Sequence, residues 1–348
     1  MTTDDIIRQR LLNLHIAHTP HSHPHELVGA LLAMQAQEYA MAKWAIGLRL
    51  PGSTDAAVEK AFNEGQILRT HLMRPTWHFV APADIRWLLR LTAPHVHRFN
   101  AYMYRKMELD ETLFRRCNHI IAKELEGGKF LTRTALNEAL SRETIPADGI
   151  RLSCIMMCAE LEGIICSGPR QGKQFTYALL DERVPDVPKP FYREEALAEL
   201  ATRYFATRGP AILADFTWWS GLSSKDAKAA IGALSAQFVR QTVDGEEYVY
   251  IPNDTALETH HQTTFLFPDF EEYGISYKKR DLYFPPDRPT LSPYDHMVTL
   301  DGKMAGTWKR IKKGKTEEVE ATPFAPLNKK QQTTWDNAVK KYNNFIRP

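Results

Sequence analysis

The middle of the chain shows helical and strand patterns in a definite order. Residues 110–126 carry apolar side chains at helical spacing and end at a glycine pair, and residues 131–140 and 150–162 predict two further helices. Apolar segments at residues 164–166 and 174–178, joined by a polar, Gly-containing loop, predict a two-stranded hairpin. Three helices followed by a hairpin with a basic tip are typical of a winged helix-turn-helix unit, whose third helix usually enters the major groove of DNA.

The same order of elements recurs on both sides of this unit. On its C-terminal side, helices and strands are predicted at residues 191–207, 211–219, 223–234, 238–242 and 247–251. On its N-terminal side, a looser version is predicted at residues 4–14, 24–34, 38–48, 54–64, 67–70 and 76–80. Thr132 and Ser223 are expected to cap the helices that follow them, and Asp244-Gly245 is a strong hairpin turn.

Beyond residue 263 the pattern changes to alternating polar and apolar positions. Strands are predicted there at residues 265–268, 297–300, 306–311 and 317–321, followed by a closing helix at about 329–346. This region reads as a small β-rich domain. The predicted domains are residues 1–108, 109–182, 183–260 and 261–348.

Composition places the chain among ordinary folded proteins. It has 348 residues, of which 43% are hydrophobic and 25% charged, and its formal net charge of +2 neither requires nor excludes nucleic acid. The longest apolar segments fall short of the ~18 residues that span a bilayer, and the acidic N-terminus lacks the apolar core of a signal peptide. We therefore expect a cytoplasmic protein that is nucleoid-associated when it is bound to DNA.

Cysteine and histidine side chains are the candidate metal ligands of the sequence. Cys154 and Cys158 share one helix face, but zinc sites normally use pairs two residues apart or a matching histidine pair. The four cysteines are therefore predicted to be small core residues. Five histidines between His15 and His25 fit either a transition-metal site or an exposed loop, and the sequence leaves both readings open.

Short basic clusters are spread along the chain. They are Arg115-Arg116, Lys278-Lys279-Arg280, Lys309-Arg310 and Lys312-Lys313 with Lys315, and the helix predicted at residues 82–107 adds a stripe of Arg86, Arg90, Arg98, Arg105 and Lys106. A single cluster of this kind is usually a solvated surface. Several clusters beside winged-helix patterns favour contacts with DNA phosphates.

A glutamine motif near the N-terminus connects the chain to a known family. Residues 31–44, with Gln35 and Gln37 on either side of Ala36, resemble the Gln-aliphatic-Gln motif of the winged-helix DNA glycosylases of the AlkZ/YcaQ type. Further stretches similar to this family follow in order at residues 69–80, 209–221, 265–273 and 301–308. The resemblance covers nearly the whole chain, and it depends on the joint order of these stretches.

Together with the helix and strand patterns, the resemblance implies a fold, an activity and a partner. The fold class is α+β, with tandem winged helix-turn-helix units followed by a small β-barrel-like C-terminal domain, forming a cleft around duplex DNA. The activity is that of a monofunctional glycosylase that hydrolyses the N-glycosidic bond of alkylated purines, including N7-alkylguanine and interstrand cross-links. We expect a monomer that uses no metal or small-molecule cofactor and does not bind a membrane. Its expected partner is double-stranded DNA containing alkylated bases.

The resemblance also implies site residues. Gln35 and Gln37 match the catalytic pair, and glutamine at position 37, where one branch has aspartate, favours the branch associated with bulky N7-purine adducts and cross-links. One hairpin is implied to lie near the catalytic pocket, and one basic loop is implied to probe the duplex. The residues expected to contact DNA are Arg69, His71, Arg74 and Trp77, then Lys278, Lys279 and Arg280, and finally Lys309 and Arg310.

Glutamine chemistry limits the reaction. An amide does not titrate, so neither Gln35 nor Gln37 can act as a general base, but together they could aim one water at the anomeric carbon. This suits a cationic N7-alkylated purine, which leaves readily, whereas an unmodified base would need a carboxylate and a protonated leaving group. Residues two apart diverge on a helix, so the motif must lie at a helix end or in a loop, or only one amide touches the water. The neighbouring carboxylate of Glu38 could replace or assist the amides.

Two other classes of function fit the same patterns. The first is a winged-helix protein without catalysis that regulates or shapes DNA. The second, which ranks last, is a protein-interaction module. Release of N7-methylguanine from a duplex separates the enzyme from both.

Overall fold

The computed structural model describes the chain except for residues 185–191, 254–262, 285–294, 314–315 and 348, so Lys315 of the last basic cluster lies outside the described residues. The chain divides into two compact units, which are described separately below. Unit 1 comprises Met1–Glu59 and Leu197–Pro348, and unit 2 comprises Lys60–Ala196. The four-part division expected from the sequence stays a prediction. No helix in the described part of the chain combines the length and apolar character needed to cross a membrane.

Unit 1 begins with helices. Its first elements are α1 (Thr3–Asn13), α2 (Pro24–Leu31), the short strand β1 (Ala33–Gln35), α3 (Tyr39–Arg49) and α4 (Asp55–Asn63). The last residues of α4 belong to unit 2. The Thr2 hydroxyl caps α1 by accepting a hydrogen bond from the Asp5 N–H at 3.2 Å. The four helices occupy the regions where the sequence predicts them, but α2 is shorter than expected.

Residues 24–34 do not form the single helix that their apolar pattern predicts. α2 ends at Leu31, Leu32 has a positive φ of 68°, and the chain continues as β1. The Leu31 and Ala33 carbonyls accept hydrogen bonds from the buried Arg208 guanidinium instead of from helical N–H groups. A tertiary partner far along the chain thus overrides the local helical preference, which periodicity cannot reveal.

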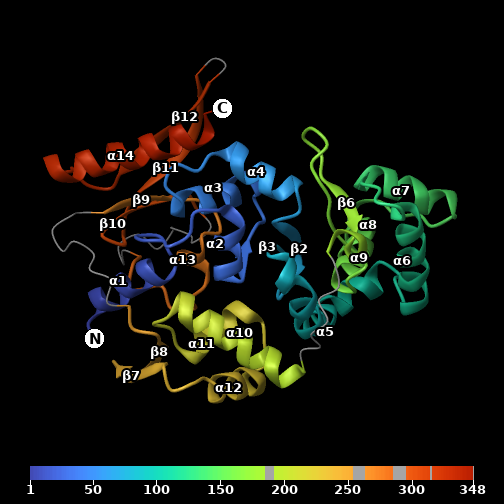
Figure 1. Ribbon diagram of the computed structural model, residues 1–348, viewed down its shortest axis with the longest axis horizontal. Helices are drawn as coiled ribbons and strands as arrows, with labels where there is room; N and C mark the ends of the chain where they lie inside the picture. The colour runs from blue at the N-terminus through green and yellow to red at the C-terminus, as the bar shows by residue number, and fades with distance from the viewer. Residues whose placement is uncertain (185–191, 254–262, 285–294, 314–315, 348) are drawn as a thin grey trace. The chain divides into compact units, whose positions relative to one another are not determined.

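A four-stranded antiparallel sheet forms the C-terminal part of unit 1. Its strand order is β12-β11-β10-β9, with β9 (Thr264–Phe267), β10 (Met297–Leu300), β11 (Lys303–Lys313) and β12 (Thr316–Pro323). The helix α14 (Lys329–Ile346) packs against β9 and β12, and α3 also packs against β9. Figure 1 shows the blue N-terminal helices beside this orange and red sheet. The indole N–H of Trp44 on α3 donates to the Leu266 carbonyl at 2.8 Å and ties the two ends of the chain together.

This sheet is open, which corrects the β-barrel-like domain implied by the resemblance. Among the described residues, β12 and β9 are its edges, and they do not pair with each other. Four strands are about half of the ~8 that close a small barrel around packed side chains. The apolar side of the sheet is buried by α14 and α3 rather than by further strands.

A second group of elements in unit 1 follows the order predicted for residues 191–251. It contains α10 (Arg193–Arg208), which starts in unit 2, then α11 (Leu213–Ser220), α12 (Ser224–Gly232), β7 (Val239–Val243) and β8 (Glu246–Tyr250). The Ser223 hydroxyl caps α12 by accepting from the Asp226 N–H at 3.1 Å, as predicted. The β7–β8 turn has positive φ at Asp244 and Gly245, 49° and 78°, which confirms the predicted hairpin. α13 (Glu272–Ile275), a single turn, was not predicted.

Unit 2 contains the elements predicted from residue 67 to residue 178 and two short elements that were not predicted. They are β2 (Leu68–Leu72), β3 (Thr76–Val80), α5 (Pro82–Lys106), α6 (Glu111–Leu125), β4 (Leu131–Thr132), α7 (Arg133–Arg142), α8 (Gly149–Leu161), β5 (Ile165–Ser167), β6 (Thr176–Leu179) and α9 (Leu180–Arg183). The strands β4, β6 and β5 form one sheet in that order. Thr132 caps α7 as predicted, since its hydroxyl accepts from the Ala135 N–H at 3.2 Å. The sequence did not predict β4 or α9.

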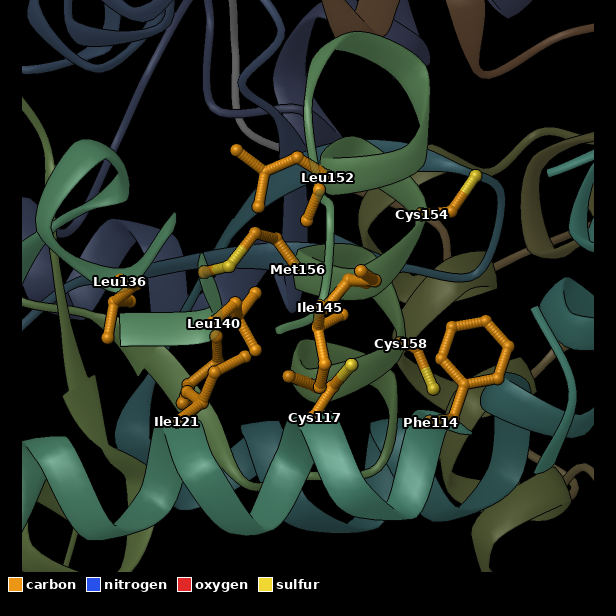
Figure 2. Packing of buried hydrophobic residues seen from close by; sticks show 14 of the residues in the cluster. Phe114, Cys117, Ile121, Leu136, Leu140, Ile145, Leu152, Cys154, Met156 and Cys158 are labelled. Carbon is orange, nitrogen blue, oxygen red and sulfur yellow. The ribbon is translucent and has the colours of Figure 1, made fainter. Parts of the chain in front are cut away.

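The core of unit 2 lies between α6, α7 and α8. Figure 2 shows the side chains that meet there, among them Phe114, Ile121, Leu140, Met156 and the three cysteines Cys117, Cys154 and Cys158. All four cysteines of the chain are buried and free. Burial raises the pKa of the Cys158 thiol to about 12 and that of Cys117 to about 11, so these thiols stay neutral. The prediction that the cysteines are small core residues is confirmed.

Candidate functional site

The glutamine motif lies between two helices rather than inside one. Gln35 is the last residue of β1 and its side chain is buried, while Gln37 is half-buried in the bend before α3. The motif therefore starts in extended backbone, and the helical geometry that would separate two amides does not apply. The motif lies outside the helices, as expected, but it begins in a strand rather than at a helix end or in a loop. Glu38 is exposed at the N-cap of α3, and its side chain does not cap that helix.

A buried carboxylate holds the backbone of Gln35. The Gln35 N–H donates to Glu272 Oε1 at 2.9 Å, and Glu272 is the first residue of α13. The other oxygen of Glu272 accepts from the Ser276 hydroxyl at 2.7 Å and from the Trp219 indole at 3.2 Å. One carboxylate, 2% exposed, thus connects the motif to α13 and α11.

Arg208 completes this support from the other side. Its guanidinium forms an ion pair with Glu272 at 2.8 Å and donates to the Leu31 and Ala33 carbonyls at 3.0 and 2.8 Å. It also lies over the Trp219 ring, 4.4 Å from the centroid. Arg208 is fully buried, so its charge depends on Glu272 for neutralisation. The pair therefore fixes three backbone groups in the five residues that end at Gln35.

The electrostatics of this pair keep Glu272 ionised. Burial by itself would raise the pKa of Glu272, but the Arg208 charge and the hydrogen bonds from the Gln35 N–H and the Ser276 hydroxyl outweigh burial. The net effect lowers the pKa to about 2. At neutral pH the carboxylate is charged and acts only as an acceptor, which suits an anchor for the Gln35 N–H.

A second buried pair anchors the neighbouring residue. Arg49 at the end of α3 bonds to Glu271 at 2.5 Å, and its guanidinium also donates to the Leu14 and Ala45 carbonyls. Both side chains of the pair are fully buried. Glu271 thus attaches α13 to α3, the helix after the glutamine motif. Its neighbour Glu272 attaches α13 to the motif itself. Sequence reasoning missed both acids, although two adjacent glutamates in an otherwise aromatic and apolar stretch were a visible signal.

The hairpin residues predicted to contact DNA gather in unit 2. Arg69 and Trp77 lie on β2 and β3, with the Arg69 guanidinium 4.3 Å from the centroid of the Trp77 ring and 4.7 Å from that of Phe175. His71 pairs with Trp77 across the hairpin, and its ring nitrogen Nδ1 contacts the buried Glu160 carboxylate. The remaining member, Arg74, is half-buried in the tight turn between the strands.

Packing within this hairpin limits its accessible surface. Arg69 is 8% exposed and His71 is 5% exposed, so neither presents a free charge or ring to solvent in this state. Trp77 and Arg74 are half-buried and have more accessible surface. Contact of these four residues with DNA stays a prediction.

Most residues of the two basic clusters of unit 1 are exposed, and three of them pair with acids. Lys279 forms an ion pair with Glu246. On β11, Lys309 lies 3.3 Å from Glu320 and Arg310 lies 3.5 Å from Glu317. These carboxylates reduce the local positive charge that the sequence suggested.

The loop after α13 is held in place at its backbone. The exposed Lys278 donates its backbone N–H to Asp215 on α11 at 2.8 Å. The Arg280 guanidinium lies 5.5 Å from the centroid of the Trp218 ring. The loop follows directly on α13, the helix that anchors Gln35. Lys278 is three residues after Ile275, the last residue of that helix. Its role as a duplex probe stays a prediction.

One group of side chains in the described part of the chain has atoms close enough to hold a metal ion, and it lies in unit 2. His97, Cys158 and Glu162 each offer one ligand atom, and these atoms lie within 4.8 Å of one another. His97 Nε2 and a Glu162 oxygen are 2.9 Å apart, within hydrogen-bonding distance. The five histidines of residues 15–25 do not form such a group. Two of them, His15 and His21, pack edge to face with ring centroids 4.9 Å apart.

Three comparisons with known proteins cover most of the chain. The model of the family described as "DNA glycosylase AlkZ-like" matches residues 28–345. The "Interstrand DNA cross-link repair glycosylase" of Streptomyces sahachiroi is 23% identical over 324 residues, which are 86% of this chain and 84% of that protein. The solved structure of the Streptomyces sahachiroi DNA glycosylase AlkZ is similar in fold, with a TM-score of 0.79 and 18% identity, covering 100% of this chain and 98% of that one.

Proposed function

The chain belongs to the AlkZ-like DNA glycosylase family, and from this premise we propose that it hydrolyses the N-glycosidic bond of N7-alkylated purines in double-stranded DNA. The observation that carries the proposal is the anchoring of the Gln35 backbone by the buried Glu272–Arg208 pair. Two neutral amides can only position a water, so they must be held rigidly. A buried, fully hydrogen-bonded ion pair supplies that rigidity.

In the proposed reaction, the Gln35 and Gln37 amides align one water with the anomeric carbon of the damaged nucleotide. A bond forms between the water oxygen and this carbon while the bond to the purine nitrogen breaks, and its electron pair goes to the purine. The N7-alkylated purine is cationic before cleavage, so it leaves as a neutral base. The proton of the water passes to solvent, and an abasic site remains. This balance needs no co-substrate other than water.

The proposed substrate includes interstrand cross-links. The name of the curated relative assigns cross-link repair to that protein, and glutamine at position 37 favours the same branch for this chain. A purine cross-linked through N7 carries the same positive charge as one with a simple alkyl group. Its bond to the sugar is therefore weakened in the same way, and water positioning is sufficient for either lesion.

We propose that two winged-helix units hold the duplex. The first is α6, α7 and α8 with the β5–β6 hairpin, and the second is α10, α11 and α12 with the β7–β8 hairpin. The order of elements in each group supports this assignment, as does the family. In this reading, the third helix and the hairpin of each group are the elements that meet DNA.

The test is base release from a duplex that carries one N7-methylguanine. We expect the wild-type protein to leave an abasic site that alkali converts to a strand break. A Gln35→Ala, Gln37→Ala double variant should lose at least tenfold in the single-turnover rate of release, because the water is no longer aligned. Its affinity for the duplex, measured by fluorescence anisotropy, should stay within about twofold of wild type.

A matched glutamine serves as the control. Gln332→Ala removes an exposed amide on α14 that bonds to Asp336, so release should be unchanged. If the wild-type protein releases no base from this duplex or from a cross-linked one while binding both, the glycosylase assignment fails. A DNA-binding protein without catalysis would then be the better description.

A further inference from the structure

The second half of α5 has an unusual exposed face. Phe99 is 69% exposed and Tyr102 is 67% exposed, and both lie on this helix of unit 2. Spacings of three and four residues put Arg98, Arg105 and Lys106 on the same face as Tyr102. All three cationic side chains are also exposed. The face, called the α5 face below, therefore combines two aromatic rings with three positive charges.

The cations of the α5 face have no acidic partner in the described part of the chain. The salt bridges found there include neither Arg98, Arg105 nor Lys106, unlike Lys279, Lys309 and Arg310 of the sequence-predicted clusters. Over its whole length, α5 has five basic residues against one acid, Asp84, which is buried. The first acid along the chain after the helix is Glu108, which is exposed. The positive charge of the face is thus available to a ligand.

The aromatic residues decide which ligand fits. Phosphates of an intact duplex are bound by cations and polar groups, and a duplex offers no base faces to an exposed ring. Single-stranded nucleic acid is bound by aromatic side chains on which bases stack, beside cations that follow the backbone. Exposed Phe99 and Tyr102, flanked by unpaired cations, have this second combination.

We propose that the α5 face binds an unpaired, single-stranded segment of DNA, with Phe99 and Tyr102 as stacking platforms for two bases and Arg98, Arg105 and Lys106 as phosphate contacts. Arg98 and Arg105 are seven residues apart, which is about 10 Å along a helix at ~1.5 Å per residue. The face is therefore long enough for a short stretch of one strand. This rests on the proposed function, in which DNA is the substrate, and adds unpaired DNA as a second ligand.

The test measures binding of the full chain to an undamaged, labelled oligothymidine by fluorescence anisotropy. A Phe99→Ala, Tyr102→Ala double variant should lose at least tenfold in affinity, because each base–aromatic stack contributes about 1–3 kcal/mol. Tyr192→Ala is the matched control, since Tyr192 is also 69% exposed in unit 2 but lies outside the α5 face, and its affinity should equal that of wild type. Both variants remove exposed rings, so their thermal unfolding should match wild type.

The charge contribution is tested separately. Replacing Arg98, Arg105 and Lys106 with alanine should reduce the slope of log affinity against log salt by about 2, at ~0.7 per phosphate contact on a single strand. Lys60→Ala is the control, because Lys60 is an exposed cation of unit 2 that lies 3.8 Å from Glu64 and belongs to none of the basic clusters. Affinity of the Phe99→Ala, Tyr102→Ala variant for oligothymidine equal to that of wild type would overturn the proposal. Because this oligonucleotide has no lesion, a failure of base release leaves the result unaffected, so the two proposals can fail independently.

Discussion

Glu272 shows how a carboxylate can matter for a reaction that it does not touch. It is 2% exposed, and it accepts hydrogen bonds from the Gln35 N–H, the Arg208 guanidinium and the Ser276 hydroxyl. Removing one partner of a buried ion pair leaves an uncompensated charge, which costs about 3–5 kcal/mol. Glu272 is therefore a positioning residue for the glutamine motif as well as a strong contributor to stability.

Replacing Glu272 with glutamine should destabilise unit 1 and change its response to acid. We expect a loss of about 3 kcal/mol at pH 7, because Arg208 stays buried without a counter-charge. The pKa of Glu272 is about 2 in the folded protein, below its ordinary 4.5, so its stabilisation is present above pH 4.5 and is lost as the pH falls towards 2. Urea unfolding at several pH values between 2.5 and 7 measures the free energy of unfolding. This free energy should depend less on pH for E272Q than for wild type.

Two further variants separate positioning from stability. Asp336→Asn removes an exposed carboxylate of α14 and should change neither stability nor its pH dependence by much. An Arg208→Met, Glu272→Met double variant should recover part of the stability lost in E272Q, since apolar side chains often replace a buried ion pair without cost. Its base release should stay low, because the Gln35 N–H has lost its acceptor. Identical pH profiles for wild type and E272Q would contradict this role.

At the scale of elements, local signals predicted most helices and strands. Helical spacing identified α6 and α8, and the capping residues Thr132 and Ser223 have the predicted roles. Asp244-Gly245 identified its hairpin because only a few residues adopt positive φ readily. These features depend on neighbours within a few residues, so a short stretch of sequence is enough to predict them.

Elements that depend on distant partners were predicted less well. The segment that became β1 looks helical, and its true form depends on Arg208 and Glu272. α13 is a single turn, too short for periodicity to identify, yet its N-cap Glu271 and its first residue Glu272 are the two buried acids. For the same reason the glutamine motif was found from the sequence, while the residues that support it were not.

Gly306 marks a place where β11 has no room for a side chain. A Cβ there would lie 2.5 Å from the Thr322 carbonyl oxygen on β12 and 2.5 Å from the ring of buried Trp335 on α14. Gly306→Ala should therefore destabilise the protein by about 1–3 kcal/mol through overpacking. The measurement is the midpoint of urea unfolding at neutral pH.

Gly232 provides the matched control for that substitution. It is the last residue of α12, and a Cβ there meets no atom within 4 Å. Gly232→Ala should leave stability unchanged or raise it by up to about 1 kcal/mol, because alanine favours the helix. Equal stability of the two alanine variants would show that β11, β12 and α14 are less closely packed at Gly306 than the structure indicates.

At the scale of the whole molecule, unit 1 is assembled from the two ends of the chain. Arg49 pairs with Glu271, Trp44 bonds to Leu266, and Gln35 is held by Glu272. Each contact joins the first 59 residues to the part after residue 197. Such long-range pairing leaves no local pattern, so the sequence could not predict that the first and last parts of the chain share a core.

Unit 2, in contrast, is one continuous stretch, and this predicts which part of the protein folds alone. Its core cluster, from Tyr104 to Tyr177, lies entirely within Lys60–Ala196. A fragment of residues 60–196 should therefore show helical circular dichroism and a cooperative thermal transition, since a domain with its own core can fold by itself. A fragment of residues 197–348 should show no such transition, because it lacks Arg49, Trp44 and the glutamine segment that pair with it. Adding residues 1–59 as a separate chain should restore part of its structure, and a cooperative transition in 197–348 alone would contradict the shared core.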